Sequence, residues 1–276
     1  MTSGPALFNA CDYLLDRHIR AGRGDRLALT GVAGDLSYAE LADRVTHAAR
    51  GLRGLGLQAE QRVVMVMADS PEFVVVYLAA MRIGAVPVPI STMLRADGIA
   101  EILADSRARV VVVSAAYRDV VAAALGYPEV TEVMAVVTDG ELADADESDE
   151  IYPTTADSPA FWLYTSGTTG TPKGAMHRHG SVQVVCETYG TQVLGITPED
   201  RCLSAAKAFF AYGLGNSVLL PMSAGAAAVL EPSPSRPVPR LWPNGPGNTP
   251  PRCSSPVLPS SRTCCVLACP RTPSPG

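Results

Sequence analysis

Long apolar runs are absent from this 276-residue sequence, and no run reaches the roughly 18 residues that a membrane span needs. The amino-terminal residues carry no leading cluster of positive charge and no long apolar stretch, so we expect no signal peptide and a cytoplasmic location. Positive charge is not in excess either: the formal net charge of -5 argues against a nucleic-acid partner or an anionic membrane surface. With 47% apolar and 18% charged residues, the sequence predicts a soluble globular protein.

Cysteine and histidine spacings typical of metal sites are also lacking. Cys11, Cys186 and Cys202 are scattered through globular-looking sequence, and we expect them to be buried or inert thiols. The other four cysteines lie in the last 24 residues without a CxxC pair or a supporting histidine. His177 and His179 stand two apart with no third partner, which is typical of a helix start rather than of a metal site. We therefore predict no metal-ligating residues.

The pattern up to residue 231 alternates between strands and helices. Continuously apolar runs are typical of strands buried on both faces of a parallel sheet, and they occur at 63–67, 110–113 and 133–137. Helical patterns stand at 7–20, 41–56, 71–83 and 97–105, with short strands expected at 26–30, 34–38 and 86–90. This rhythm predicts an α/β fold of layered sheets and helices. The acidic stretch from Asp139 to Glu150 is expected to be a solvated loop.

The composition changes abruptly at Pro232. The last 45 residues hold 13 of the 23 prolines and four of the seven cysteines, and they contain no Asp, Glu, Lys, Phe or Tyr. A segment so rich in proline and so poor in apolar periodicity cannot build a core. We therefore divide the chain into a folded part, 1–231, and an aberrant, disordered tail, 232–276.

The tail has the character of a sequence translated in a shifted register. If the last base of each codon is joined to the first two bases of the next, Trp242 followed by Pro243 must encode alanine. Cys264 followed by Cys265 must encode leucine. Choice among degenerate codons then gives a segment with an amphipathic helix and an apolar strand. We interpret the tail as frameshifted near 232–240, and a natural disordered tail is the alternative.

The most informative stretch runs from 161 to 174 and reads FWLYTSGTTGTPKG. An apolar strand leads into hydroxyls and glycines, which let backbone N–H groups approach an anion, and Lys173 adds a mobile positive charge. The stretch is not a Walker A loop, because Pro172 stands five positions after Gly167 and no Gly-Lys-Ser/Thr follows. A plain Ser/Thr/Gly linker is disfavoured by the strand patterns on both sides. We predict an exposed phosphate-binding loop from Tyr164 to Gly174.

The string TSGTTGTPKG closely resembles the phosphate-loop signature of the acyl-adenylate-forming superfamily, the AMP-dependent synthetases and ligases. Two further segments match in order and spacing: LSYAEL at 36–41 resembles an early TY.EL element, and 77–90 contains a G-A-x-x-P element. The resemblance covers 7–231 and implies the N-terminal domain of adenylate-forming enzymes, in incomplete form. It implies that the ATP phosphates contact Thr165, Ser166, Gly167, Thr168, Thr169, Gly170 and Lys173.

Residues 207–216, KAFFAYGLGN, resemble the segment that lines the carboxylate pocket in the benzoate-CoA ligase branch. Aromatic rings offer a flat apolar wall, and small residues beside them leave room for a substrate. The resemblance therefore implies substrate contacts from Ala211, Tyr212 and Gly213. Alternatively, Phe209, Phe210 and Tyr212 pack the core. Lys207 is expected to be solvated or ion-paired, without a catalytic role.

The resemblance implies a reaction in two steps that uses ATP, Mg²⁺ and CoA. A carboxylic acid, benzoate or a related aromatic acid, attacks the α-phosphorus of ATP and releases pyrophosphate; the CoA thiol then displaces AMP. The family's Thr-Glu element, its ribose-binding Asp and its C-terminal lysine have no counterpart after Glu231. We therefore assign no catalytic residue and expect this copy to be truncated and inactive. A carrier-protein-directed adenylation domain and a non-catalytic nucleotide-binding fragment remain alternatives, and the oligomeric state is not predicted.

Overall fold

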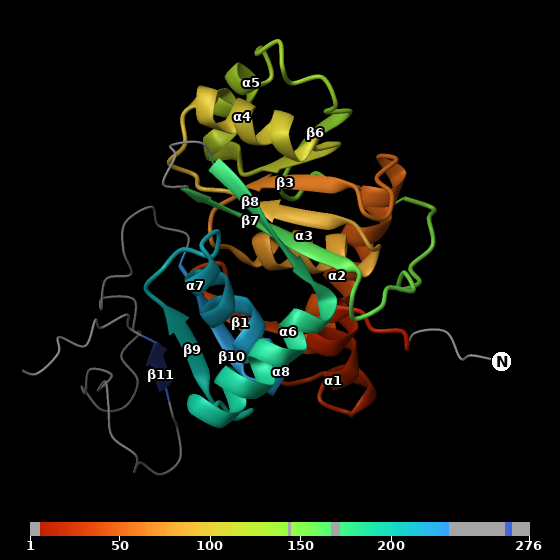
Figure 1. Ribbon diagram of the computed structural model, residues 1–276. Helices are drawn as coiled ribbons and strands as arrows, with labels where there is room; N and C mark the ends of the chain where they lie inside the picture. The colour runs from red at the N-terminus through yellow and green to blue at the C-terminus, as the bar shows by residue number, and fades with distance from the viewer. Residues whose placement is uncertain (1–5, 143–144, 167–171, 232–262, 267–276) are drawn as a thin grey trace, which may run out of the picture.

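The computed structural model describes residues 6–142, 145–166, 172–231 and 263–266 (Figure 1). It contains a four-stranded sheet, a five-stranded sheet and a two-stranded hairpin, with helices covering the faces of the sheets. The layered α/β fold expected from the sequence is confirmed. No helix in the described part of the chain is both long enough and apolar enough to cross a membrane.

The four-stranded sheet is entirely parallel, in the order β4-β3-β5-β6. Its strands are β3 (Arg62–Val66), β4 (Val86–Pro89), β5 (Val110–Val113) and β6 (Ala135–Thr138). Alternate residues of β3 face different cores: Val63 and Met65 belong to one cluster, and Val64 and Val66 to the other. Because both faces of the sheet are covered, the strand is apolar at every position after Arg62.

Helices cover both faces of this sheet. In Figure 1, α4 (Ala96–Ser106) and α5 (Arg118–Ala124) lie above the sheet, and α2 (Tyr38–Gly54) and α3 (Pro71–Arg82) lie below it. The α2 helix begins with a capping box, in which Glu40 N–H donates to Ser37 Oγ at 3.2 Å and Ser37 N–H donates to Glu40 Oε2 at 2.8 Å. A short 3₁₀ turn, η2 (Ala115–Tyr117), leads into α5.

The five-stranded sheet has the order β11-β9-β10-β1-β2. Its strands are β1 (Leu27–Gly31), β2 (Leu36–Ser37), β9 (Arg201–Ser204), β10 (Ala227–Leu230) and β11 (Thr263–Val266), and β2 is antiparallel to β1. β1, β10, β9 and β11 are mutually parallel. The larger core lies between this sheet and the four-stranded one, since it joins Leu29 of β1 and Leu230 to α2, α3 and Val110 of β5.

The remaining helical segments are η1 (Asp12–Asp16), α1 (Arg17–Arg20), α6 (His179–Val185), η3 (Cys186–Val193), α7 (Ala211–Leu214), η4 (Gly215–Leu219) and α8 (Leu220–Ala224).

Several boundaries differ from the sequence-based expectation: the helix expected at 41–56 is Tyr38–Gly54, and the strand expected at 34–38 is Leu36–Ser37. The strand expected at 133–137, buried on both faces, is Ala135–Thr138, and its Val136 is 38% exposed because β6 is the edge strand of its sheet. Two further differences lie near the ends of the chain. The first helix does not begin at Leu7, because Leu7 forms a β-bridge with Thr155 and the Phe8 N–H donates to Thr154 O at 2.8 Å. The tail is expected to lack regular structure, yet Thr263–Val266 forms β11 on the open edge of β9. Threonine and valine favour strands, and β9 offers an unpaired edge at this position. The rest of the tail lies outside the described residues.

Other expectations are met in the described part of the chain. Cys11, Cys186 and Cys202 are buried, and burial raises the pKa of the Cys186 thiol to about 11. The acidic stretch is mostly exposed, and Arg53 donates to the backbone carbonyl of Glu150 at 2.8 Å. His179 is the first residue of α6, as the sequence predicts for a helix start.

Candidate functional site

The predicted phosphate-binding loop joins the two strands of an antiparallel hairpin. β7 (Pro159–Ser166) pairs with β8 (Pro172–Arg178), with Thr165 opposite Lys173 and Ser166 opposite Pro172. The exposed loop expected from Tyr164 to Gly174 is therefore too long: its first three and last three residues belong to the paired strands. From Phe161 to Ser166 the pairing keeps one continuous register, so the ladder extends past the aromatic residues of β7. Gly167, Thr168, Thr169, Gly170 and Thr171 lie outside the described residues.

Aromatic side chains fasten this hairpin to the four-stranded sheet. Trp162 and Tyr164 pack against the smaller core, and the Arg62 guanidinium lies 5.6 Å from the centre of the Trp162 ring. The Tyr164 hydroxyl donates to the Asp105 carboxylate, and burial raises the pKa of Tyr164. Gly174 stands opposite Tyr164, and a Cβ there would come within 3.2 Å of the tyrosine ring. Glycine at this position therefore leaves room for the ring that anchors the strand.

Two of the predicted ATP-binding side chains lie at the loop end of this anchored hairpin. Thr165 and Lys173 are both exposed and are direct cross-strand partners. A hydroxyl and an ammonium group side by side on a rigid ladder can donate to an anion without first folding a loop around it. Ser166 ends β7, and only its backbone position is described.

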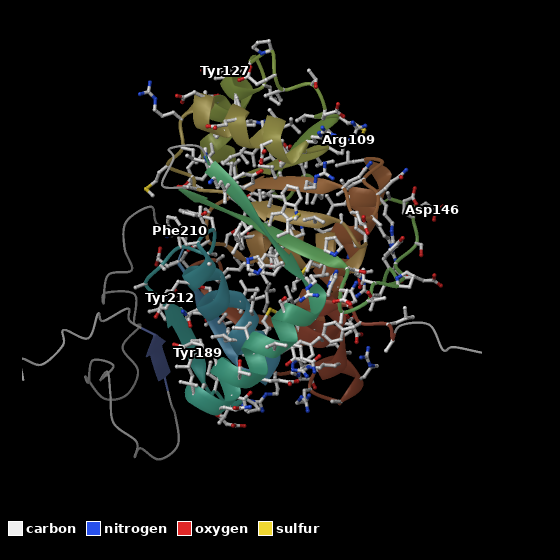
Figure 2. All side chains as sticks on the ribbon, viewed as in Figure 1. Arg109, Tyr127, Asp146, Tyr189, Phe210 and Tyr212 are labelled. Carbon is white, nitrogen blue, oxygen red and sulfur yellow. The ribbon has the colours of Figure 1, made fainter. Side chains whose placement is uncertain are left out.

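The predicted substrate residues lie on a different element, the short helix α7. Ala211 and Tyr212 are exposed, whereas Gly213 is buried. Phe209 is buried, while Phe210 is 47% and Tyr212 40% exposed. The sequence left open whether these aromatic residues line a substrate pocket or pack the core. Phe209 packs in the core, whereas Phe210 and Tyr212 do not. Figure 2 shows Phe210, Tyr212 and Tyr189 one below another on the left of the view.

The glycine of this segment permits a tight backbone approach. A Cβ at Gly213 would lie 1.8 Å from the Lys207 carbonyl oxygen, which no side chain can tolerate without moving the backbone. The Phe210 N–H donates to the same Lys207 oxygen at 3.0 Å, and the Leu214 N–H donates to Phe210 O at 2.8 Å. The chain thus turns closely upon itself between Lys207 and Leu214, and it presents Phe210 and Tyr212 outward.

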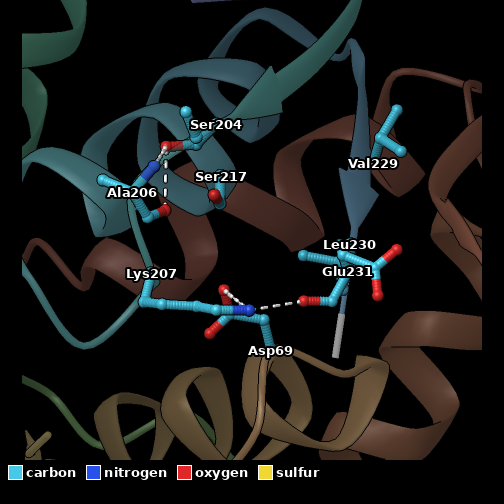
Figure 3. A pocket seen from close by; sticks show the side chains of 9 residues that line it. Asp69, Ser204, Ala206, Lys207, Ser217, Val229, Leu230 and Glu231 are labelled. Atoms are coloured by element: carbon cyan, nitrogen blue, oxygen red, sulfur yellow. Dashed lines mark hydrogen bonds and ion pairs between the residues drawn. The ribbon is translucent and has the colours of Figure 1, made fainter. Parts of the chain in front are cut away.

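A buried cluster of charges lies where this segment begins (Figure 3). Lys207 Nζ donates to the Glu231 backbone oxygen at 2.9 Å and lies 3.7 Å from Asp69 Oδ2, while Asp69 Oδ1 accepts the Ala208 N–H at 3.1 Å. Sequence reasoning expected Lys207 to be solvated or ion-paired, without a catalytic role, and the structure pairs it; Asp69 was not singled out. Their positions in the sequence could have pointed to them. Asp69, Lys207 and Glu231 each follow the carboxyl end of a parallel strand, and ligand sites of α/β proteins commonly lie at these strand ends.

Metal-ligating groups do not converge in the described part of the structure, where no three His, Cys, Asp or Glu side chains are arranged to hold an ion. His177 lies on β8 and stacks on Phe161 with the ring centroids 4.5 Å apart. His179 Nδ1 accepts the Ala10 N–H at 2.9 Å, and burial lowers its pKa to about 4. His177 thus packs against an aromatic ring, and His179 holds the backbone at Ala10.

With this geometry established, the chain can be compared with known proteins. The family model described as AMP-binding enzyme matches residues 15–244. A benzoate–CoA ligase of Thauera aromatica is 40% identical over 248 residues, covering 86% of this chain and 47% of that protein. A 4-hydroxybenzoate–CoA/benzoate–CoA ligase of Rhodopseudomonas palustris is 39% identical over 237 residues, covering 82% of this chain and 43% of that protein.

Solved structures give the same picture. A benzoate CoA ligase from Burkholderia xenovorans LB400 superposes with a TM-score of 0.74 at 35% identity, covering 82% of this chain and 46% of that one. The chain therefore spans about half the length of the relatives it matches, and the matched half is the one that contains the hairpin and the aromatic segment.

Proposed function

The chain belongs to the AMP-binding enzyme family, and from this membership we propose that it carries the phosphate-binding half of an AMP-forming acid–CoA ligase. The enzyme would join a carboxylic acid to ATP as an acyl-adenylate and then pass the acyl group to CoA. The single observation that carries the proposal is the anchored hairpin, which presents Lys173 and Thr165 together beside the Ser/Thr/Gly loop.

In the first step the acid carboxylate attacks the α-phosphorus, the bond to the bridging oxygen breaks, and pyrophosphate leaves with the electron pair. Negative charge grows on the departing phosphates, so a fixed positive charge beside them lowers the barrier. We assign that role to Lys173, with Thr165 as a hydroxyl donor. Gly167, Thr168, Thr169 and Gly170, together with Ser166, are proposed to supply further N–H and hydroxyl donors. In the second step the CoA sulfur attacks the acyl carbon and AMP leaves.

The proposed acid is benzoate or a related aromatic acid. Phe210 and Tyr212 project from the surface around Ala211, where a flat ring can lie against them. Gly213 allows the close turn that sets these side chains outward. The two relatives described above are ligases of benzoate and 4-hydroxybenzoate, which supports an aromatic substrate for this segment.

The described residues do not form a magnesium site by themselves. Mg²⁺ commonly keeps several waters and binds through substrate phosphates with one or two carboxylates, so we propose that it arrives with ATP. ATP and CoA are intracellular substrates, and for that reason we propose a cytoplasmic location.

We further propose that the chain has two parts, a partial adenylation domain at 1–231 and a frameshifted tail at 232–276. The support is compositional: the tail holds 13 of 23 prolines and lacks Asp, Glu and Lys. On this proposal, ligase activity belongs to the protein whose tail is translated in the alternative register, and the chain as written does not turn over.

Product analysis tests the proposed function. The protein with its tail in the alternative register is incubated with benzoate, MgATP and CoA, and the products are identified by mass spectrometry. We expect AMP, pyrophosphate and benzoyl-CoA. Formation of benzoyl-adenylate without a CoA thioester would instead favour adenylation directed to a carrier protein. Release of ADP would exclude the proposed chemistry.

A further inference from the structure

The buried pair Asp69–Lys207 is not explained by the proposed chemistry. Asp69 and Lys207 side chains are only 9% and 19% exposed, and they connect two sheets: Asp69 follows β3, and Lys207 follows β9. In Figure 3 the dashed lines run from Lys207 to Asp69 and to the backbone of Glu231, beside a small cavity that Ser204 and Ser217 also line. The pair therefore ties together three separate strand ends.

Stability alone does not account for this pair. Burial raises the pKa of Asp69 to about 6; Lys207 and the Ala208 N–H pull it down, and Glu231 adds to the rise. Because the net pKa shift is upward, the partners stabilise the ionised carboxylate by less than desolvation destabilises it. The ionised form of Asp69 therefore lowers the free energy of unfolding. Net stabilisation by the ionised carboxylate therefore does not explain its position.

The choice of cation is also specific. Lys173 and Lys207 are the only lysines in the chain, which otherwise uses arginine. Lysine carries a compact ammonium group, whereas arginine carries a broad planar fork. At Lys207 the ammonium group donates to a carbonyl at 2.9 Å while it faces a carboxylate at 3.7 Å. The space between this carbonyl and this carboxylate therefore suits a compact ammonium group better than a broad guanidinium group.

The cluster controls where the aromatic segment begins. Asp69 fixes the Ala208 N–H on one side and the Lys207 side chain on the other. The Lys207 carbonyl in turn accepts the Phe210 N–H and lies over Gly213. A shift of Lys207 therefore moves Phe210, Ala211 and Tyr212 together.

We infer that Asp69 and Lys207 are positioning residues for the acid substrate: they hold the start of the segment 207–216 between the two sheets, so that Phe210 and Tyr212 form a fixed wall for the aromatic ring. The substrate named here rests on the proposed function, whereas the positional role rests on the cluster alone.

Hydrogen exchange of the full chain tests the positional role without reference to activity. Asp69→Asn removes the charge with little change of shape, and we expect the amides of Ala208 and Phe210 to exchange at least several-fold faster while those of β7 and β8 keep their rates. Asp16→Asn is the matched control, because Asp16 also pairs with a partly buried cation, Arg82, at 2.8 Å. The control is expected to leave 208–216 unchanged. Unchanged exchange in Asp69→Asn would overturn the inference.

Ligand affinity then links the position to the substrate. Because Phe210 and Tyr212 would no longer be held in place against the ring, we expect Asp69→Asn to weaken benzoate binding to the full chain by about 10-fold, which corresponds to about 1.4 kcal/mol. ATP binding should stay the same. In the wild type the same loss should appear as the pH falls through about 6, where Asp69 takes up a proton, and it should be absent from Asp69→Asn. Equal weakening of benzoate binding and ATP binding in Asp69→Asn would overturn the inference. A wild-type chain that binds neither ligand would count against the proposed function, and the hydrogen-exchange result would then decide the positional role.

Discussion

Lys173 is the residue on which the proposed phosphate site most depends. It is exposed, lies opposite Thr165 and is held by a hairpin whose aromatic residues are packed. Hydrogen bonds to charged groups contribute about 1.5–3 kcal/mol, so Lys173→Ala should lower kcat/KM for ATP by about 10- to 100-fold in acid-dependent pyrophosphate exchange.

The matched control is Arg178→Ala, which removes an exposed cation from the other end of the same strand, where it pairs with Asp157 at 2.6 Å. This variant should retain the wild-type rate. If both variants lose exchange equally, the effect is one of general charge or folding, and Lys173 is not a phosphate ligand.

His179 gives a prediction on pH. Burial lowers its folded-state pKa from 6.5 to about 4, so between these two pH values the unfolded chain binds the proton and the folded chain does not. Stability therefore falls as the pH drops from 6.5 to 4, with a slope of up to about 1.4 kcal/mol per pH unit from this group. Asparagine can accept the Ala10 N–H in place of Nδ1.

Denaturant unfolding at several pH values measures this effect. His179→Asn should show a shallower loss of stability than the wild type over this window. A slope equal to that of the wild type would mean that His179 is protonated in the folded state.

At the scale of the element, the turn from Lys207 to Leu214 depends on one glycine. A Cβ at Gly213 would clash with backbone at 1.8 Å, whereas a Cβ at Gly215 would meet nothing within 4 Å. Gly213→Ala should cost about 1–3 kcal/mol of unfolding free energy through overpacking, and it should displace Tyr212. Gly215→Ala, two residues later, should be neutral or stabilising by up to about 1 kcal/mol.

Thermal unfolding of the two variants compares them directly. Equal melting temperatures for the two would show that the backbone at Gly213 can relax, and the tight turn would then not be a requirement of the sequence at that position.

The elements differ in how far the sequence predicts them. The strand at 62–66 and most of the helix at 38–54 follow from local patterns, since uniform apolar residues mark burial on both faces and helical spacing marks the helix from residue 41 on. The helix begins three residues earlier than expected, after the capping box of Ser37 and Glu40. The extent of the β7–β8 ladder depends on cross-strand pairing, and β11 depends on an open edge contributed by β9, more than fifty residues earlier. Such boundaries are set by distant partners, so local pattern cannot give them.

The candidate site shows the same limit. The Ser/Thr/Gly stretch and Lys173 are recognisable as a contiguous motif. The cluster of Asp69, Lys207 and Glu231 is different. Asp69 and Lys207 are 138 positions apart in the sequence, and only the packing of two sheets brings them together. Its members look unremarkable individually in the sequence.

At the scale of the whole molecule, the frameshift proposal makes a prediction about the gene. Read one register over, the codons from about 232 to 276 should contain no stop codon, with alanine across Trp242–Pro243 and leucine across Cys264–Cys265. Nucleotide sequencing of the coding region and its downstream flank checks this. The open frame should continue beyond the tail and encode a Thr-Glu element and a later lysine. A stop codon in that register within the tail would remove the proposal.

We propose that this chain belongs to an enzyme that activates an aromatic acid as its adenylate. The most direct measurement is benzoate-dependent exchange of labelled pyrophosphate into ATP, made on the protein whose tail is returned to the alternative register by one added base. We expect exchange that requires benzoate or a close aromatic analogue and that acetate does not support. Lys173→Ala should reduce this exchange by about 10- to 100-fold. Absence of exchange with every aromatic acid tested, or exchange that acetate supports equally well, would contradict this proposal.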